Sequence, residues 1–187
     1  MTRRRAILMS NNWFNVLFVP DDEVVAETIA AWRWLIPDPW KMLFCSMVGG
    51  IFFERGSGGV FWLECPTGDL ERVANSAAEF HAYLGGPRDN DWTRQVEESF
   101  LPDFVDRLHR AGKIPGPGQC YGLTILPVFE GGTYSVENVF VVPVREWLIY
   151  TASMHKQLRD IPQDSQVRIK IVGSRVELHP FDSNHDE

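Results

Sequence analysis

Cysteine is scarce in this chain, and its positions do not suit a metal site or a disulfide framework. The three cysteines are an odd number and show no Cys-x-x-Cys spacing: Cys45, Cys65 and Cys120. Zinc sites and disulfide frameworks require paired or closely spaced cysteines. The five histidines are scattered as well, and none has a second histidine or cysteine at a metal-ligand spacing. We therefore expect reduced structural thiols, with no metal and no cofactor.

Catalytic signature motifs are also missing. The sequence has no Gly-x-Ser-x-Gly elbow, no His-Glu-x-x-His, no phosphate-binding loop and no dinucleotide fingerprint. The glycine-rich tract at 56–59 has no Lys-Ser/Thr pair after it and leads into a predicted strand, so it does not indicate a nucleotide site. We expect no catalytic residues and a protein that is not an enzyme.

No long hydrophobic run is present. A membrane-spanning helix needs about 18 or more consecutive apolar residues, and the apolar patches between 40 and 53 are broken by Lys41, Ser46 and glycines. The apolar stretch at 6–9 is too short for the core of a secretory signal. The sequence thus predicts a cytoplasmic protein without a membrane partner.

Basic residues are outnumbered, with 18 Lys and Arg against 25 Asp and Glu, for a net charge of -7. This balance disfavours attraction to a phosphate backbone, and we expect no nucleic-acid partner. Arg3, Arg4 and Arg5 could form a small basic arm or simply a solvated terminus. Paired acidic residues could bind a hard cation, but they lack the spacing of a calcium loop, and a solvated or partner-facing acidic surface is the simpler interpretation.

What is present is a domain-sized chain rich in apolar residues. Its 187 residues are 44% hydrophobic and 12% aromatic, which is enough to form a packed core. The patterns predict an α+β fold, an antiparallel β-meander packed against several α-helices. We divide the chain into an N-terminal strand and helix extension (1–40), a main domain (40–180) that forms one compact unit with it, and a frayed tail (181–187).

In the first half, a short strand at 13–20 precedes a helix that begins at Asp21 and Asp22. The predicted buried stripe of this helix is Val25, Ile29, Trp32 and Ile36, and Pro37 and Pro39 are expected to end it. Glycine-rich turns separate four predicted strands, at 42–47, 51–54, 60–65 and 70–73. Ser76 and Glu79 have the spacing of a capping box, in which each side chain caps the other residue's backbone amide at a helix start.

In the second half, a helical stretch is predicted from Asp91 and another at 102–111, with Val105 and Leu108 facing inward. Residues 112–122 contain many helix and strand breakers and predict a loop. Strands follow at 123–129 and 139–142. The helix after Pro143 should bury Trp147, Thr151, Met154 and Leu158. The clearest period-two pattern lies at 167–172 and predicts a hairpin, with a turn at 173–174 and a second strand at 175–179.

Glu137 and Asn138 follow a Gly-Gly turn and admit two interpretations. They could act as a catalytic carboxylate and amide, or they could cap the backbone of the turn. No nucleophile or base lies near them in the sequence, which favours capping. An enzyme would need a pocket that gathers titratable groups, for example Glu137 with Tyr134 and His155.

The segment from Gly118 to Leu158 carries a family resemblance. Its sequence is Gly-Gln-Cys-Tyr-Gly-Leu at 118–123 and Phe-Glu-Gly-Gly-Thr-Tyr-Ser-Val-Glu-Asn at 129–138, and a predicted helix follows. It resembles the C-terminal domain of the Tdi-type immunity proteins of bacterial type VI secretion, formerly a domain of unknown function, over residues 40–172. The matched residues are structural ones: Gly118, Tyr121, Gly122, Gly131, Gly132, Tyr134, Glu137 and Asn138. The longer family members have a preceding GAD-like domain, whereas this chain has only about 40 residues there.

The resemblance implies a non-catalytic, cytoplasmic protein that binds and blocks a toxic effector, often a DNase. An acidic surface could complement a basic nuclease, and the expected partner-binding residues are Glu97, Glu98, Asp103 and Asp106. Two alternatives stay open: a small-molecule-binding domain or enzyme, and a regulatory adaptor. Exposed tryptophans at 13, 40 or 92 could form a contact surface, although burial in the core is favoured. The sequence does not determine the effector, the interface or the oligomeric state.

Overall fold

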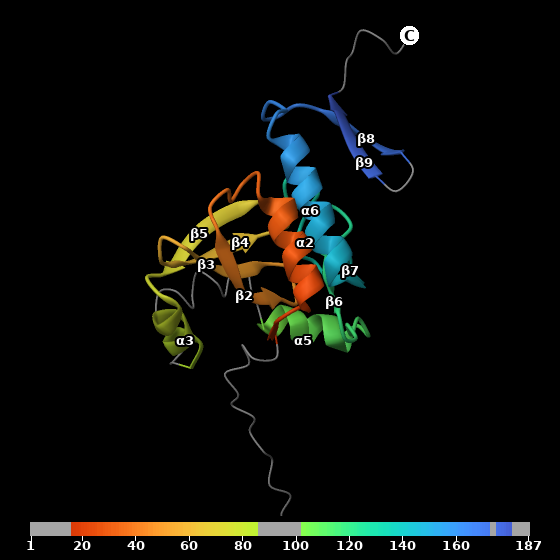
Figure 1. Ribbon diagram of the computed structural model, residues 1–187. Coiled ribbons are helices and arrows are strands. Elements are labelled where there is room, and N and C mark those ends of the chain that lie inside the picture. Colours follow the sequence, from red (N-terminus) through yellow and green to blue (C-terminus); the bar gives the residue numbers. More distant parts are fainter. Residues whose placement is uncertain (1–15, 86–101, 173–174, 181–187) are drawn as a thin grey trace, which may run out of the picture.

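The computed structural model describes residues 16–85, 102–172 and 175–180. Its centre is a five-stranded antiparallel sheet in which the strands follow one another in chain order (Figure 1). The strands are β1 (Leu17–Phe18), β2 (Trp40–Ser46), β3 (Ile51–Arg55), β4 (Val60–Glu64) and β5 (Asp69–Ala74). This arrangement confirms the predicted α+β fold and the predicted meander. The short, glycine-rich connections produce it, because tight turns join only strands that lie side by side.

Both faces of the sheet are covered. Ile51, Phe52 and Phe53 are consecutive in the central strand β3, and all three are buried. Successive side chains of a strand point to opposite faces, so a run of buried residues requires cover on each side. Phe80 of α3 (Ala77–Gly85) packs against Phe52, with ring centroids 5.0 Å apart.

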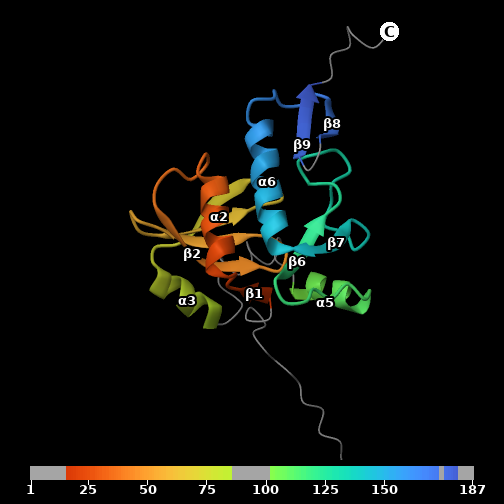
Figure 2. The same ribbon diagram turned by 45° about the vertical axis from the view of Figure 1, so that its right-hand side comes forward.

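Helices α2 (Asp22–Trp32) and α6 (Val144–Leu158) lie side by side against the sheet (Figures 1 and 2). The α2 helix starts as predicted, because the Asp21 carboxylate accepts a hydrogen bond from the Val24 amide at 2.9 Å. Its buried residues are Val24, Thr28 and Trp32, whereas the predicted Val25 and Ile29 are half-buried. The helix ends at Trp32, five residues before Pro37, and a turn then brings Ile36 into the core.

Two further helices have the predicted positions. At the start of α3 the Ser76 hydroxyl accepts from the Glu79 amide, but the Glu79 carboxylate caps the Asn75 amide, one residue earlier than the predicted box. The α5 helix (Pro102–Arg110) buries Val105 and Leu108 as expected. The predicted helical stretch from Asp91 and the tail at 181–187 lie outside the described residues.

The predicted loop is present at 112–118, but the predictions for 119–129 were wrong. A strand, β6 (Gln119–Leu123), occupies the end of the predicted loop and pairs with β7 (Val139–Pro143), while 124–138 consists of turns and bends rather than a strand. The β6 strand gains its partners from distant segments, since the Tyr121 amide also donates to the Met47 carbonyl at 2.6 Å. Pairing with distant segments therefore outweighs the glycine and proline residues of this segment, which by themselves predict a loop.

One hydrophobic core joins the N-terminal helix to the rest of the described chain and extends from Val16 to Leu178. Trp40 is buried in it, and the other two tryptophans considered as contact residues, at 13 and 92, lie outside the described residues. The predicted face of α6 is confirmed: Trp147, Thr151 and Met154 are buried, and Leu158 packs partly against the core. Among the described residues, no helix is long and apolar enough to cross a membrane.

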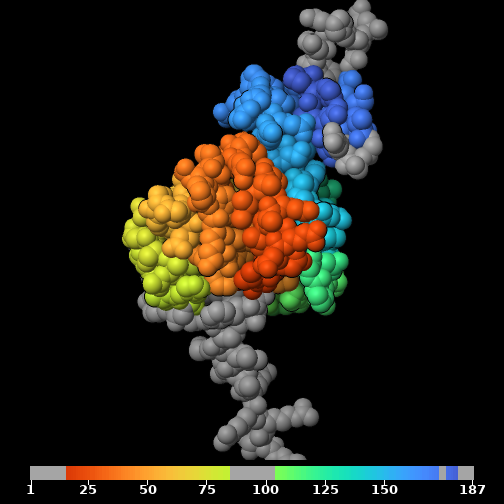
Figure 3. Space-filling model, in the orientation of Figure 1, coloured from red at the N-terminus to blue at the C-terminus, as the bar shows by residue number. Residues whose placement is uncertain are grey.

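The C-terminal hairpin of β8 (Val167–Val172) and β9 (Arg175–Pro180) forms as predicted. It stands beside the end of α6, away from the five-stranded sheet (Figure 1). In the space-filling view, this hairpin and the end of α6 form a lobe that projects from the body of the molecule (Figure 3).

Candidate functional site

The acidic residues predicted to bind a partner are only partly visible. Glu97 and Glu98 lie outside the described residues, and the side chain of Asp103 is not described. Asp106 is exposed on α5, and basic residues occupy the last turn of the same helix. The structure therefore places one of the four predicted residues at the surface and does not show the four together.

The residues of the family motif gather in β6 and in the turns at 124–138. Tyr121 is buried, and its hydroxyl donates to the Lys113 carbonyl at 2.8 Å. The Lys113 ammonium in turn donates to the carbonyls of Val136 and Val139. These contacts tie the loop before β6 to the turns before β7, so the role they indicate is structural.

Asn138 caps the turn, as predicted. Its side-chain amide donates to the Ile125 and Thr133 carbonyls, both at 2.8 Å, and its carbonyl oxygen accepts from the Ile125 amide at 2.9 Å. One side chain thereby satisfies three backbone groups in a segment without regular structure. Glu137 is exposed, and hydrogen bonds from its own backbone amide and from Ser135 lower the pKa of its carboxyl group.

The other two members of the possible catalytic group have different partners. The Tyr134 hydroxyl donates to the Glu64 carboxylate at the end of β4, and Thr67 donates to the same carboxylate at 3.1 Å. Burial raises the pKa of Glu64, although both hydrogen bonds act in the opposite direction. Burial also raises the pKa of Tyr134. This pair fastens the 124–138 segment to the sheet.

His155 of α6 is buried beside Glu64's neighbour Cys65. Its Nε2 atom lies 2.9 Å from the Cys65 carbonyl oxygen, and burial lowers the pKa of the imidazole, which keeps the ring neutral at pH 7. Nε2 therefore carries the proton and donates to that carbonyl. Glu137, Tyr134 and His155 thus each make separate local contacts. They do not form a common pocket of titratable groups.

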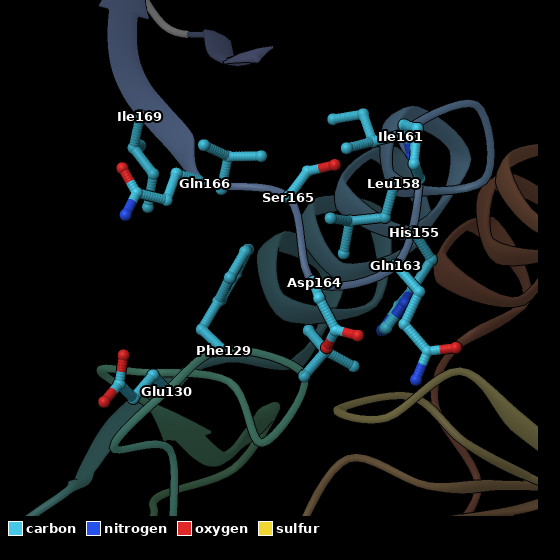
Figure 4. A pocket seen from close by; sticks show the side chains of 13 residues that line it. Phe129, Glu130, His155, Leu158, Ile161, Gln163, Asp164, Ser165, Gln166 and Ile169 are labelled. Carbon is cyan, nitrogen blue, oxygen red and sulfur yellow. The ribbon is translucent and has the colours of Figure 1, made fainter. Parts of the chain in front are cut away.

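A cleft of about 1020 Å³ opens beside these residues, between the projecting hairpin and the body. In Figure 4, Ile169 and Gln166 border it on one side, Phe129 and Glu130 lie across it, and Leu158, Ile161 and His155 form its inner end. The full lining is Val128, Phe129, Glu130, His155, Leu158, Ile161, Pro162, Gln163, Asp164, Ser165, Gln166, Val167 and Ile169.

The loop that carries the polar lining residues is tightly turned. The Ser165 amide donates to the Pro162 carbonyl at 3.2 Å, and Asp164 has a φ angle of 62°. Aspartate tolerates this left-handed conformation better than most residues because its short side chain can hydrogen-bond locally. The turn brings the chain from the end of α6 back into β8 and so positions the hairpin over the cleft.

Apolar side chains are exposed at this site. Ile169 is 54% exposed, Ile171 75% and Val128 41%. The period-two pattern of β8 predicted a strand with one apolar face, but it did not show that half of this face would be uncovered. On the adjacent strand β9 the same face is covered, since Leu178 is buried and Val176 packs against the core.

The side chain of Gln157 attaches the hairpin to α6. Its amide nitrogen donates to the Val176 carbonyl at 3.0 Å, and its carbonyl oxygen accepts from the Leu178 amide at 2.9 Å. These are the contacts that a neighbouring strand would make, and Gln157 makes them for the outer edge of β9. No sequence signal identified Gln157 or the cleft, because both depend on how the hairpin docks.

The described part of the chain holds neither a metal-binding cluster nor a reactive thiol. In the described part of the chain, no group of three His, Cys, Asp or Glu side chains could hold a metal ion. The three cysteines are buried, and burial raises the pKa of each thiol, which leaves them protonated. An open cleft lined by both apolar and polar side chains, beside an exposed strand, can accept the side chains of another polypeptide.

No protein-family model matches the chain, and no curated protein matches it. The resemblance to the immunity proteins of type VI secretion, which rests on residues 118–138 and their flanks, therefore stays a prediction.

Proposed function

We propose that this chain is a non-catalytic binding protein, an immunity protein that neutralises a DNase-like toxin of type VI secretion by direct contact in the cytoplasm. The observation that carries the proposal is the cleft of about 1020 Å³, with exposed Ile169 and Val128 in its lining and exposed Ile171 two residues further along β8. Apolar side chains gathered at a concave surface are typical of protein-binding sites.

The charge of the chain supports a basic partner. A net charge of -7 attracts a cationic nuclease and raises the rate of association, and acidic residues at the contact could occupy the groove that normally receives DNA. Asp106 on α5 presents one such charge. In this arrangement the cleft provides apolar contacts that hold the complex, while the acidic surface guides the two proteins together.

The partners of the titratable side chains also support a binding role. Glu64 and Tyr134 bond to each other, and His155 bonds to a backbone carbonyl. In a catalytic site these groups would be directed towards a substrate. Here their hydrogen bonds hold the segments that surround the cleft.

The decisive experiment is co-expression with the product of the neighbouring gene, which we expect to be the toxin. We expect cells to survive, and the two proteins to purify together as a stable complex. Absence of both rescue and complex would contradict the proposal and favour a small-molecule or enzymatic role for the cleft. Rescue without a complex would contradict direct binding, and a stable partner that is not a toxin would favour a regulatory adaptor.

Charge reversal tests the acidic part of the proposal. Replacing Glu97, Glu98, Asp103 and Asp106 with lysine should slow association about 10-fold at low salt and weaken its salt dependence. A matched control reverses four other exposed acidic residues, Asp38, Asp69, Glu71 and Asp160, and so measures the effect of net charge alone. Equal association rates for the wild type, the variant and the control would show that these four residues lie outside the interface. The cleft would then be the remaining contact.

A further inference from the structure

We propose that the outer edge of β8 binds an extended segment of the partner protein as an added strand, and that this segment alternates apolar and acidic side chains. The identity of the partner as a toxin rests on the proposed function, whereas the strand edge and its chemistry follow from the hairpin itself. Strand addition is a common mode of peptide recognition, in which backbone hydrogen bonds give affinity and alternate side chains give specificity.

The backbone geometry of the hairpin leaves the β8 edge open. Gln157 bonds to the Val176 carbonyl and the Leu178 amide, so these groups of β9 point away from β8. Their cross-strand partners are Ile171 and Ile169. These are non-hydrogen-bonded pairs of the antiparallel ladder. In such a pair, both residues direct their N–H and C=O groups away from the partner strand. Ile169 and Ile171 therefore present their backbone groups at the outer edge of β8.

No described segment occupies this edge. The hairpin is a separate two-stranded sheet, and among the described residues no other backbone group hydrogen-bonds to Ile169 or Ile171. The two edges of the hairpin thus differ within the described part of the chain. The side chain of Gln157 closes the edge of β9, whereas no described side chain closes the edge of β8 in this way. An open edge of this kind is a template for another strand.

The position of the cleft determines the first half of the partner's pattern. Ile169 shares its face of the hairpin with Leu178, which is buried towards the body, and Ile169 also lines the cleft. A strand added beside β8 would direct every second side chain to the same side as Ile169. Those side chains would enter the cleft over Phe129 and Leu158, which favours apolar residues at these positions.

Charge determines the second half of the pattern. Arg168 and Lys170 alternate with the isoleucines and are exposed on the opposite face, where His179 and Glu177 of β9 lie across from them on the inner side. Side chains directly opposite each other on neighbouring strands interact, and opposite charges stabilise the pair. Acidic residues in the partner strand would therefore face Arg168 and Lys170.

The same argument disfavours a second copy of this chain as the occupant. Two β8 strands paired antiparallel about a two-fold axis place Arg168 opposite Lys170 when Ile169 lies on the axis. When the axis passes through Lys170 or Arg168, that residue faces its own copy. Each arrangement sets like charges directly opposite, which is destabilising. Like-charge contacts thus disfavour these three registers of self-association, whereas an added strand with acidic residues opposite Arg168 and Lys170 avoids them.

Amide hydrogen exchange with synthetic peptides tests the proposal on the full chain. The probe is the peptide Glu-Val-Glu-Ile-Glu-Val-Glu, with blocked ends, titrated to about 1 mM. We expect exchange of the Ile169 and Ile171 amides to slow about 10-fold, because both amides gain hydrogen-bond acceptors. The matching peptide with lysine at each glutamate should give no protection.

Backbone methylation separates strand pairing from simple apolar adhesion. In the proposed pairing, the valine and isoleucine amides of the peptide face β8, and the glutamate amides face solvent. Methylating the valine and isoleucine amides should abolish protection, and methylating the glutamate amides should preserve it. Equal protection by both methylated peptides would overturn strand addition.

A charge-reversed protein provides the complementary variant. Lys170→Glu should weaken binding of the acidic peptide about 10-fold and strengthen binding of the lysine peptide. No slowing of Ile169 and Ile171 with the acidic peptide at about 1 mM would overturn the proposal. Protection that rises with protein concentration alone would identify a second copy as the occupant and would also overturn it.

The outcome is independent of the toxin experiment. If the toxin is neutralised and bound while exchange at Ile169 and Ile171 stays unchanged in the complex, the proposed function holds and the edge proposal fails. If the acidic peptide protects these amides and no toxin is bound, the edge proposal holds and the immunity function fails.

Discussion

At the residue scale, Gly68 and His155 show how closely α6 approaches the turn after β4. Gly68 has a φ angle of 79°, and a Cβ atom there would lie 2.8 Å from His155 Nδ1. Glycine is needed at this position twice over, for the backbone conformation and for the space. The contact lies next to the hydrogen bond between His155 and the Cys65 carbonyl, so it helps to fix the inner end of the cleft.

Gly68→Ala should therefore destabilise the protein by more than the conformational penalty alone. The control is Gly58→Ala, which has a similar φ angle of 88° and open space around the added Cβ. We expect about 1 to 2 kcal/mol for Gly58→Ala from the left-handed backbone, and a clearly larger loss for Gly68→Ala. Urea unfolding of both variants measures the difference, and equal losses would show that His155 moves aside without cost.

Glu64 gives a pH-dependent prediction. Burial raises the pKa of its carboxyl group in the folded protein, so folding shifts the protonation equilibrium of this group towards the protonated form. The stability that this group contributes is present below its unfolded pKa of about 4.3 and is lost as the pH rises through the raised folded value. Glu64→Gln does not titrate, and its Oε1 atom can still accept from Tyr134.

We therefore expect the stability of Glu64→Gln relative to the wild type to increase as the pH rises from about 4 to 7. Urea unfolding across this range measures it, with Glu71→Gln, at an exposed position of β5, as the control for loss of one surface charge. A constant difference across the range would mean that Glu64 is as well solvated in the folded protein as in the unfolded chain.

At the element scale, the β8–β9 hairpin depends on its attachment to α6. Gln157→Ala removes two hydrogen bonds to β9 and leaves the Val176 carbonyl and Leu178 amide without their partner. Each such bond contributes about 0.5 to 1.5 kcal/mol, so exchange of the Leu178 amide should become about 10-fold faster or more. Lys156→Ala, an exposed neighbour on α6, is the control. Unchanged exchange at Leu178 would show that apolar packing alone holds the hairpin.

At the scale of the whole molecule, the N-terminal helix belongs to the same core as the sheet. Trp32 at the end of α2 is fully buried, and its ring lies 6.0 Å from that of His155 on α6. Arg145 of α6 also pairs with Glu27 of α2, with Nη2 and Oε1 2.6 Å apart. The boundary near residue 40 that the sequence indicated therefore does not coincide with a break in packing.

Trp32→Ala should consequently cost about 3 to 5 kcal/mol, as expected for truncating a large buried aromatic side chain. A chain that begins at residue 40 loses all of α2 and should show no cooperative unfolding transition. Thermal unfolding followed by circular dichroism tests both, with Trp34→Ala, at a half-buried position, as the milder comparison. A cooperative transition in the shortened chain would establish residues 40–180 as an independent domain.

The sequence by itself determined the local elements of this protein. The α2 and α6 helices, the meander from β2 to β5 and the C-terminal hairpin follow from capping residues, glycine turns and hydrophobic periodicity, which act over a few residues. The capping role of Asn138 followed in the same way from its position after the Gly-Gly turn. These patterns were sufficient because the physical forces behind them are local.

Only the tertiary structure decided the remainder. The β6 strand was missed because its partners, β7 and the Met47 carbonyl, are distant in sequence. The cleft and the open edge of β8 were missed because the alternation of Ile169 and Ile171 reveals one apolar face but not whether anything covers it. Docking of β9 on α6 buries Leu178 and leaves those isoleucines exposed. Burial is a property of assembled elements, and for that reason the candidate binding site emerged only from their packing.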